Sequence, residues 1–329
     1  MTFASIIVPA FNVQATLAQT LHALLAQTYA AYEIIIVDDG STDATSRIAS
    51  DFAQDSKIRV VRQPNRGLAG ARNTGIAAAK GSVIGFCDAD DLWEPEKLAV
   101  HVAHLEANHQ VGISFSGSAL IDDDGAFTGQ AQRPRLRDID ARCIFKRNPI
   151  GNGSAPVIRR DVFDAIAFRP SHETQRDWYF DETFRQSEDI ECWLRIALST
   201  DWEFEGVPGL LTKYRISAGA LSSATDRQFA AWERTVDKLD TLAPQFFASE
   251  ASAARAYQLR YLSRRAVSDL DAPRARTLSR AWVKTSLTPM REEPLKSVVT
   301  LAAVCVLSVL GPRALRQAMT FAARTGAAQ

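Results

Sequence analysis

Short apolar runs alternate with amphipathic stretches over the first ninety residues, and this alternation restricts the possible folds more than any other feature of the chain. Residues 5–8 (SIIV) predict a strand buried on both faces, and residues 15–28 place four leucines on one face of a helix. Further strands are predicted at 33–37, 58–62 and 83–87, and further helices at 42–55 and 68–80. Strands that alternate with helices over short connections form a doubly wound α/β sheet with mostly parallel strands.

Polar clusters follow three of these strands, at Pro9–Asn12, Asp38–Asp43 and Asp88–Asp91. Ligands of doubly wound sheets bind beyond the carboxyl ends of the strands. We therefore expect one ligand site that draws on all three clusters.

The rest of the chain divides by pattern. Helices are predicted at 96–108 and 188–199, and everything beyond residue 226 is expected to be helical. The expected apolar face of the 188–199 helix consists of Ile190, Trp193, Leu194, Ala197 and Leu198. We therefore divide the chain into 1–110, a nucleotide-binding half, 111–225, an acceptor-binding half of the same domain, and 226–329, a helical C-terminal region.

Composition and charge limit the classes of partner that the chain is expected to bind. The chain has 329 residues, 46% of them hydrophobic, so it can bury a sizeable core. Its formal net charge is zero, but residues 252–329 contain 13 basic and 4 acidic side chains, a net charge of +9. Such a segment favours an anionic surface as a partner, and the lack of a recognition motif argues against nucleic acid.

The cysteines and the N-terminus indicate the compartment. Cys87, Cys143, Cys192 and Cys305 form no CxxC motif and have no disulfide-like spacing, which predicts a reduced, cytosolic environment. Residues 1–11 have no basic region and only a short apolar run, so they do not form a signal peptide.

The stretch GFCDADDLWEP places three carboxylates directly after an apolar strand. Asp91 is open to two interpretations, because D-L-W-E-P is also a typical helix start with Asp91 as its cap. Asp88 and Asp90 are better explained by a cation or by sugar hydroxyls. A hard divalent ion such as Mg²⁺ or Mn²⁺ binds one or two carboxylates together with phosphate oxygens.

Three segments together resemble glycosyltransferase family 2: SIIVPAFN, EIIIVDDGSTDAT and NRGLAGARNTGIAAAKGSVIGFCDADDLWEPEKL. The resemblance covers roughly residues 4–220 and implies a GT-A fold, an inverting nucleotide-sugar glycosyltransferase and a divalent metal. It identifies Asp88-Ala89-Asp90 as the DXD motif, with Asp90 at the metal and Asp88 near the ribose. Asp39 would accept from a uracil ring NH. The positions that match the nucleotide-binding set are Pro9, Ala10, Phe11, Asn12, Asp38, Asp39, Gly67, Arg72, Asp88 and Ala89. For Arg72, an arginine on a helix surface is the alternative.

The predicted helix at 188–199 begins with two acids, Glu188 and Asp189. Acids in a first turn interact favourably with the helix dipole, and Ser187 could cap the helix, so a structural role is open. Members of the family have an acidic pair before a "WLR" helix. The resemblance therefore implies that Asp189 is the catalytic base and that Glu188 supports the acceptor.

The resemblance extends to the second half of the domain. Residues 148–160 resemble the family's element under the acceptor site, and 213–217 resemble its closing segment. Ser217 stands where many relatives have histidine, so we expect Arg215 to supply the positive charge in its place. Trp93 and Arg215 are the residues expected on the acceptor and phosphate side. Residues 167–178 are long for the family and are expected to shape acceptor choice.

Residues 297–312 carry no charge over 16 positions, fewer than the roughly 20 that a spanning helix needs. A buried helix, a monotopic helix and a tilted span are all open. From Pro294 onwards there are no acids, so we favour peripheral attachment at the inner face of the plasma membrane.

The expected function is an inverting, metal-dependent transfer of a sugar, most simply from a UDP-sugar, to a carbohydrate or lipid-linked acceptor in surface polysaccharide synthesis. A catalytically silent nucleotide-sugar-binding or scaffold protein of the same fold is the alternative. A nucleotidyltransferase would need a glycine-rich phosphate loop after the first strand, and PAFNVQAT has none.

Overall fold

The computed structural model describes residues 1–216 and 225–317. The chain forms two compact units, one of residues Met1–Ile144 and Asn148–Thr235, the other of Phe145–Arg147 and Val236–Gln329. The boundary between 110 and 111 that the sequence predicts stays a prediction.

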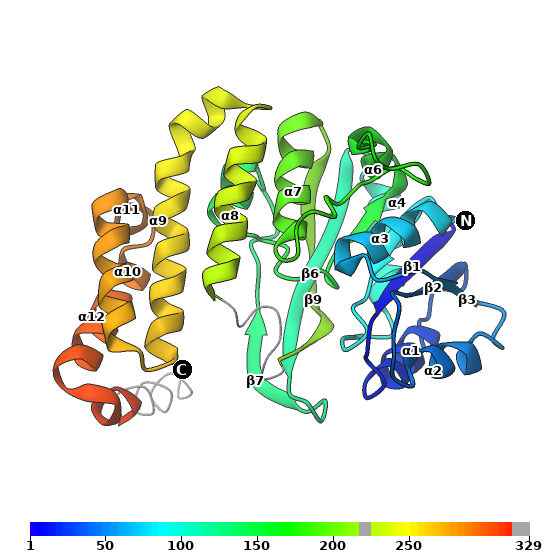
Figure 1. Cartoon of the computed structure of the whole chain (residues 1–329), viewed down its shortest axis with the longest axis horizontal. Coiled ribbons are helices and arrows are strands. Elements are labelled where there is room, and N and C mark those ends of the chain that lie inside the picture. Colours follow the sequence, from blue (N-terminus) through cyan, green and yellow to red (C-terminus); the bar gives the residue numbers. More distant parts are fainter. Residues whose placement is uncertain (217–224, 318–329) are drawn as a thin grey trace. The chain divides into compact units, whose positions relative to one another are not determined.

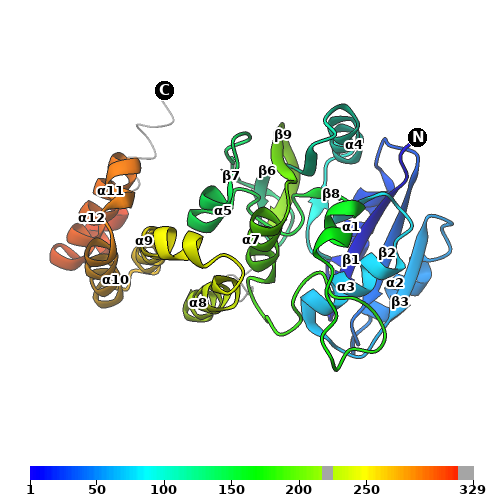
Figure 2. The same ribbon diagram turned by 90° about the horizontal axis from the view of Figure 1, so that it is seen from above.

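A mixed sheet forms the centre of the first unit (Figures 1 and 2). Its strands are β1 (Ala4–Ala10), β2 (Tyr32–Asp38), β3 (Ile58–Arg62), β4 (Val83–Phe86), β5 (Leu92–Trp93), β6 (Val111–Ile121), β7 (Phe127–Gln132), β8 (Val157–Arg159) and β9 (Glu203–Arg215). They follow the order β3-β2-β1-β4-β8-β6-β9-β5, and β7 pairs with β6.

The first four strands are parallel, as the alternation predicts. β1 and β2 are buried along their whole length, which explains their unbroken apolar sequence. In register, Ala10 lies opposite Asp38 and Asp38 opposite Arg62, so the carboxyl ends of these strands meet at one edge. Ile7 lies opposite Phe86, so the DXD loop after β4 starts at the same edge. That the three polar clusters form one ligand site stays a prediction.

The helices of this unit are α1 (Leu17–Leu25), α2 (Thr45–Phe52), α3 (Gly67–Ala78), α4 (Lys97–Ala107), α6 (Arg160–Ile166) and α7 (Glu188–Ser199), together with the first parts of α5 (Ala141–Lys146) and α8 (Thr225–Asp240). α3 packs on β1 and β2, and α4 packs on β6, β8 and β9. The expected apolar face of α7 is only half right. Trp193 and Leu194 are buried, but Ile190 is half-buried, and Glu191 and Arg195 are buried as an ion pair at 2.8 Å.

The second unit is helical, as expected. It contains α9 (Pro244–Ser268), α10 (Ala272–Thr285), α11 (Thr288–Glu292) and α12 (Pro294–Val309). α9, α10 and α12 pack on one another around Ala266, Ala275, Val304 and Leu307. Across residues 1–216 and 225–317, every helix is too short or too polar to cross a membrane.

Candidate active site

The DXD loop connects β4 to β5, and its last carboxylate is a structural group. Asp91 is completely buried and accepts hydrogen bonds from Ser154 Oγ at 2.6 Å and from the backbone N–H of Arg215 at 2.9 Å. β5 follows it, and α4 begins only at Lys97. The interpretation of Asp91 as a helix cap is therefore wrong, because a contact more than 120 residues away in sequence, to Arg215, takes up its carboxylate.

Asp90 is the carboxylate of this loop that remains available. Among the described side chains no group donates a hydrogen bond to it, and Arg215 acts on it only through its charge. Burial, followed by the charge of Asp88, raises the pKa of Asp90 to about 6. A half-buried carboxylate whose hydrogen-bond donor is its own backbone N–H is a suitable ligand for a hard cation.

A cation at Asp90 would need oxygen ligands from elsewhere. Within residues 1–216 and 225–317, no group of three or more His, Cys, Asp or Glu side chains could hold a metal ion. Mg²⁺ commonly binds in this way, through one or two carboxylates plus water and substrate phosphates. The donor set fits such an ion and does not fit a fully protein-ligated metal centre.

Two residues expected on the acceptor and phosphate side are buried and bonded to the protein itself. Trp93 is 2% exposed, and its indole donates to the backbone oxygen of Ser154 at 3.0 Å. Arg215 is 4% exposed, and its guanidinium donates to Gln19 and to the backbone oxygens of Asp90, Asp122 and Asp123. Arg215 thus fastens the DXD loop, and the phosphate contact expected of it stays a prediction. Ser217 lies outside the described residues.

Arg72 joins carboxylates from the expected donor and acceptor sides. It lies in the second turn of α3 and is 2% exposed, so the alternative of a surface arginine is excluded. Its Nη1 donates to Glu188 at 2.6 Å and its Nη2 to Asp88 at 3.0 Å. Burial alone would lower the pKa of Arg72, but the charges of Asp88, Glu188 and Asp189 raise it. The guanidinium is therefore a fixed cation between the DXD loop and the start of α7.

The expected base, Asp189, is the second residue of α7. Its carboxylate accepts from the backbone N–H of Ile190 at 2.8 Å and from Asn148 Nδ2 at 3.5 Å. Burial raises the pKa of Asp189, and the nearby Arg72 opposes the shift. A weakly solvated carboxylate with a raised pKa is a better proton acceptor than one in water. Ser187 has a left-handed backbone (φ 60°) and makes no capping bond, so its expected role as a cap is wrong.

On the nucleotide side, Asp38 and Asp39 organise the loops around them. Asp38 accepts from the backbone N–H of Ser41 at 3.0 Å. Asp39 accepts from Gln63 Nε2 at 2.6 Å and from the backbone N–H groups of Arg66 at 2.8 Å and Gly67 at 2.9 Å. These bonds leave Asp39 at most one further acceptor position, so a uracil NH would be its last partner.

The remaining expected nucleotide contacts lie at the end of β1. Pro9 and Ala10 belong to the buried strand. Phe11 is 48% exposed and presents an aromatic face beyond the strand end. Asn12 connects two loops, because its Oδ1 accepts from the backbone N–H of Thr42 at 2.8 Å. In the DXD loop, Ala89 is buried.

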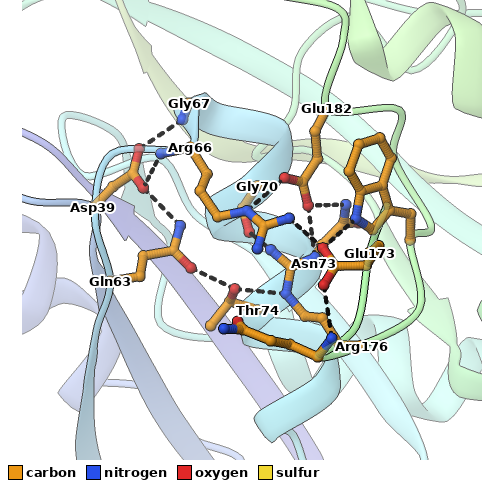
Figure 3. A network of polar contacts seen from close by, with 12 residues as sticks. Asp39, Gln63, Arg66, Gly67, Gly70, Asn73, Thr74, Glu173, Arg176 and Glu182 are labelled. Atoms are coloured by element: carbon orange, nitrogen blue, oxygen red, sulfur yellow. Dashed lines mark hydrogen bonds and ion pairs between the residues drawn. The ribbon is translucent and has the colours of Figure 1, made fainter. Parts of the chain in front are cut away.

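A polar network fastens residues 167–184 to α3 (Figure 3). Arg66 binds both Glu173 and Glu182, and Arg176 binds Glu182 at 2.6 Å. Asn73, completely buried, accepts from the backbone N–H groups of Tyr179 and Phe180 and donates to Glu182. The segment that the sequence predicts to shape acceptor choice is thus anchored on the donor-side helix.

Sequence reasoning missed several supporting residues. Ser154 accepts from the backbone N–H of Asp88 at 2.9 Å while its hydroxyl binds Asp91. Gly153 lies against Arg72, and a Cβ there would be 2.1 Å from Arg72 Nη2. Lys97 is completely buried under the loop, with its Nζ 2.7 Å from the backbone oxygen of Ala155. The motif GNGSAP contains the first two, but their partners could not be read from it.

Residues 5–167 match the family described as "Glycosyl transferase family 2". The Escherichia coli protein named UDP-Glc:alpha-D-GlcNAc-diphosphoundecaprenol beta-1,3-glucosyltransferase WfgD is 30% identical over 67% of this chain and 79% of its own length. The chain belongs to glycosyltransferase family 2. It spans about half or less of the length of several other curated relatives that it matches.

Solved structures of this family's fold superpose on the chain. S. aureus TarS 1–349 in complex with UDP-GlcNAc gives a TM-score of 0.59 at 16% identity, covering 94% of this chain and 92% of that one. The mannosyltransferase PcManGT from Pyrobaculum calidifontis, in complex with GDP-Man and Mn²⁺, gives 0.57 at 20% identity, covering 94% and 87%. The fold that the motifs predict is confirmed.

Proposed function

We propose that this family 2 glycosyltransferase transfers a sugar from a nucleotide sugar, most simply a UDP-sugar, to a lipid-linked acceptor with inversion at the anomeric carbon. The observation that carries the proposal is the buried Arg72, which binds both the DXD carboxylate Asp88 and Glu188, the neighbour of Asp189 at the start of α7. The name of WfgD supports the substrate class. A β-glucoside made from UDP-glucose, whose sugar is α-linked, is an inverted product.

In this mechanism Asp189 accepts the proton of the acceptor hydroxyl as that hydroxyl attacks the anomeric carbon. Its place at the start of α7 fixes its position, and Glu188 is held by Arg72. Phe11 and the loop ordered by Asp39 would hold the nucleotide base. A divalent cation at Asp90 would neutralise the leaving diphosphate.

The enzyme is proposed to work at an anionic membrane surface through α12. Leu295, Val298, Val299 and Val309 are 54–75% exposed on this helix. The first three lie within about one turn of one another on one face, and Val309 continues the apolar surface at the end of the helix. Basic residues without neighbouring acids follow, which suits anionic lipid.

The test begins with a thermal-shift panel of nucleotide sugars with and without Mn²⁺, because a bound donor raises the melting temperature by mass action. The donor so identified is then assayed with synthetic GlcNAc-diphosphate lipids as acceptors. Asp90→Ala should remove metal-dependent donor binding. Asp189→Asn should keep donor binding and lower turnover by about 10³-fold or more.

Asp51→Asn, an exposed carboxylate on α2 whose side chain is 61% accessible, serves as the control and should change neither quantity. Near-normal turnover of Asp189→Asn would exclude Asp189 as the base. Saturable donor binding without transfer to any acceptor and without slow donor hydrolysis would instead identify a binding protein.

A further inference from the structure

An arginine-lined pocket of about 370 Å³ lies in the first unit, between residues 183–186 and the first turns of α8. Its cations are Arg185, Arg227 and Arg234, and its apolar wall is Phe184, Ala230 and Ala231. We call it the three-arginine pocket. Its size falls in the range of ordinary ligand sites.

The three arginines are not paired with an acid at ion-pair distance. Among the described residues no carboxylate lines the pocket, and none of the three forms an ion pair with a described side chain. Arg234 is held in place, because it donates to the backbone oxygen of Thr183 at 2.7 Å and lies 4.4 Å from the centre of the Phe184 ring. Arg185 and Arg227 make no hydrogen bond to any described residue. Cations gathered without a paired acid repel one another, and a phosphate group would relieve that repulsion through charge-assisted bonds.

The pocket adjoins both halves of the candidate active site. Its residue Gln186 precedes Asp189 by three positions, and the chain turns into α7 at Ser187. On the other side, Arg185 Nη1 would lie 2.4 Å from a Cβ at Gly67, the first residue of α3. The Arg185 charge also acts on Asp39. The pocket therefore lies between the segment that leads into α7 and the start of α3.

We infer that the three-arginine pocket binds the diphosphate of a lipid-linked acceptor, so that the acceptor sugar reaches Asp189 from this side. The inference rests on the proposed function. The apolar wall of Phe184 and the two alanines suits the first carbons of an alkyl or prenyl chain. The groups expected to recognise a nucleotide base gather instead around Asp39 and Phe11, so the diphosphate of the donor is assigned elsewhere.

The test uses octyl diphosphate as the probe, titrated into the full chain by calorimetry in EDTA. We expect saturable binding that weakens with added salt, and little binding of octyl glucoside, which has the chain without the charge. The double variant Arg185→Gln/Arg227→Gln should bind octyl diphosphate about 30-fold or more weaker. Both side chains are exposed, so the variant should keep the circular dichroism of the parent. Arg47→Gln, an exposed arginine on α2, is the control and should bind like the parent.

Two further measurements distinguish the diphosphate of an acceptor from the diphosphate of the donor nucleotide. Asp90→Ala should bind octyl diphosphate normally although it loses UDP and Mn²⁺ binding, and UDP in EDTA should not displace the probe. Equal affinity of the double variant and the parent, or displacement by UDP, would overturn the inference.

If the parent binds UDP with Mn²⁺ but not octyl diphosphate, the pocket assignment fails while the proposed function stands. If no nucleotide or nucleotide sugar binds at all, it is the proposed function that fails.

Discussion

Arg72 Nη1 lies 2.6 Å from Glu188 Oε1, across 116 positions of the sequence, and both side chains are buried. The same guanidinium reaches Asp88 in the DXD loop. A guanidinium without water around it holds its position and its charge, because desolvation makes every unpaired alternative costly. This pair therefore fixes the distance between the expected donor and acceptor carboxylates, and it can be tested directly.

Arg72→Gln should lower the free energy of unfolding by about 3–5 kcal/mol, because it leaves Glu188 buried without its cation. The charge of Arg72 lowers the pKa of Glu188 and Asp189 against the effect of burial. Its removal should raise both pKa values, so the acidic limb of the pH–turnover profile should move to higher pH. Urea denaturation and a pH series of turnover measure the two effects.

The double variant Arg72→Gln/Glu188→Gln removes both charges and should recover part of the lost stability. The control Arg47→Gln breaks an exposed ion pair with Asp51 and should lower the free energy of unfolding by less than about 1 kcal/mol. Stability losses that simply add in the double variant would show that Arg72 and Glu188 are not coupled.

Gly153→Ala should lower turnover about tenfold or more while leaving metal-dependent donor binding nearly unchanged. The added Cβ would meet Arg72 Nη2 at 2.1 Å, so Arg72 must shift away from Asp88 and Glu188. Misplacement of about an ångström near a reacting group is costly. Steady-state kinetics measure the turnover, and donor titration measures the metal-dependent donor affinity. The control Gly129→Ala adds a methyl with no neighbour within 4 Å and should lose only some stability, from its positive φ of 80°.

The sequence predicted the elements of the first half well because hydrophobic periodicity determines them. β3 has its expected bounds, and α7 begins at Glu188 as expected. For Asp91 the local sequence pattern does not predict the structure. Its local pattern is that of a helix cap, but a hydroxyl from Ser154 and an amide from Arg215 take its carboxylate.

Residue types at the site were predictable, and their partners were not. The motifs identified Arg72, Asp88 and Glu188, but nothing local indicates that one guanidinium joins the other two. Trp93 and Arg215 lie in or next to the expected motifs, and packing across the sheet turns both inward. Long-range contacts of this kind decide whether a polar residue binds a ligand or supports a loop.

Asn73→Ala should lower the free energy of unfolding by about 2–4 kcal/mol and expose residues 167–184 to trypsin. Asn73 is completely buried, and its loss leaves the backbone N–H groups of Tyr179 and Phe180 without their acceptor. Cleavage after Arg169 and Arg176, followed by mass spectrometry, reports the release of the segment. Asn108→Ala, which removes an exposed bond to His104, should leave the trypsin pattern unchanged.

Lys97→Met should make the stability of the protein less dependent on pH above neutrality. Burial lowers the pKa of Lys97 to about 7, whereas the unfolded chain has a value near 10.4. Between these values the unfolded state binds more protons, so the wild type should gain stability as pH rises and lose it as pH falls towards 7. The difference in the free energy of unfolding between wild type and variant should change by up to about 1.4 kcal/mol per pH unit.

Denaturation at pH 7 and pH 9 measures this change for Lys97→Met and for the exposed control Lys80→Met. The control should follow the wild type at both values. If the free energies of unfolding of the wild type and Lys97→Met differ by the same amount at both pH values, Lys97 is charged in the native protein and is held by Ala155 and Thr212.

Val298→Asp/Val299→Asp should weaken binding to anionic vesicles about tenfold or more without unfolding the second unit. These side chains are 54% and 57% exposed on α12, so the acids face solvent in the free protein but oppose both the apolar contact and the negative lipid at a membrane. Flotation with phosphatidylglycerol vesicles, at low and high salt and against phosphatidylcholine vesicles, measures the effect. Val283→Asp on α10, 38% exposed, is the control and should bind like the wild type. Equal flotation of all three proteins would remove α12 as the membrane-facing element, because the acidic pair could not be accommodated at a lipid contact.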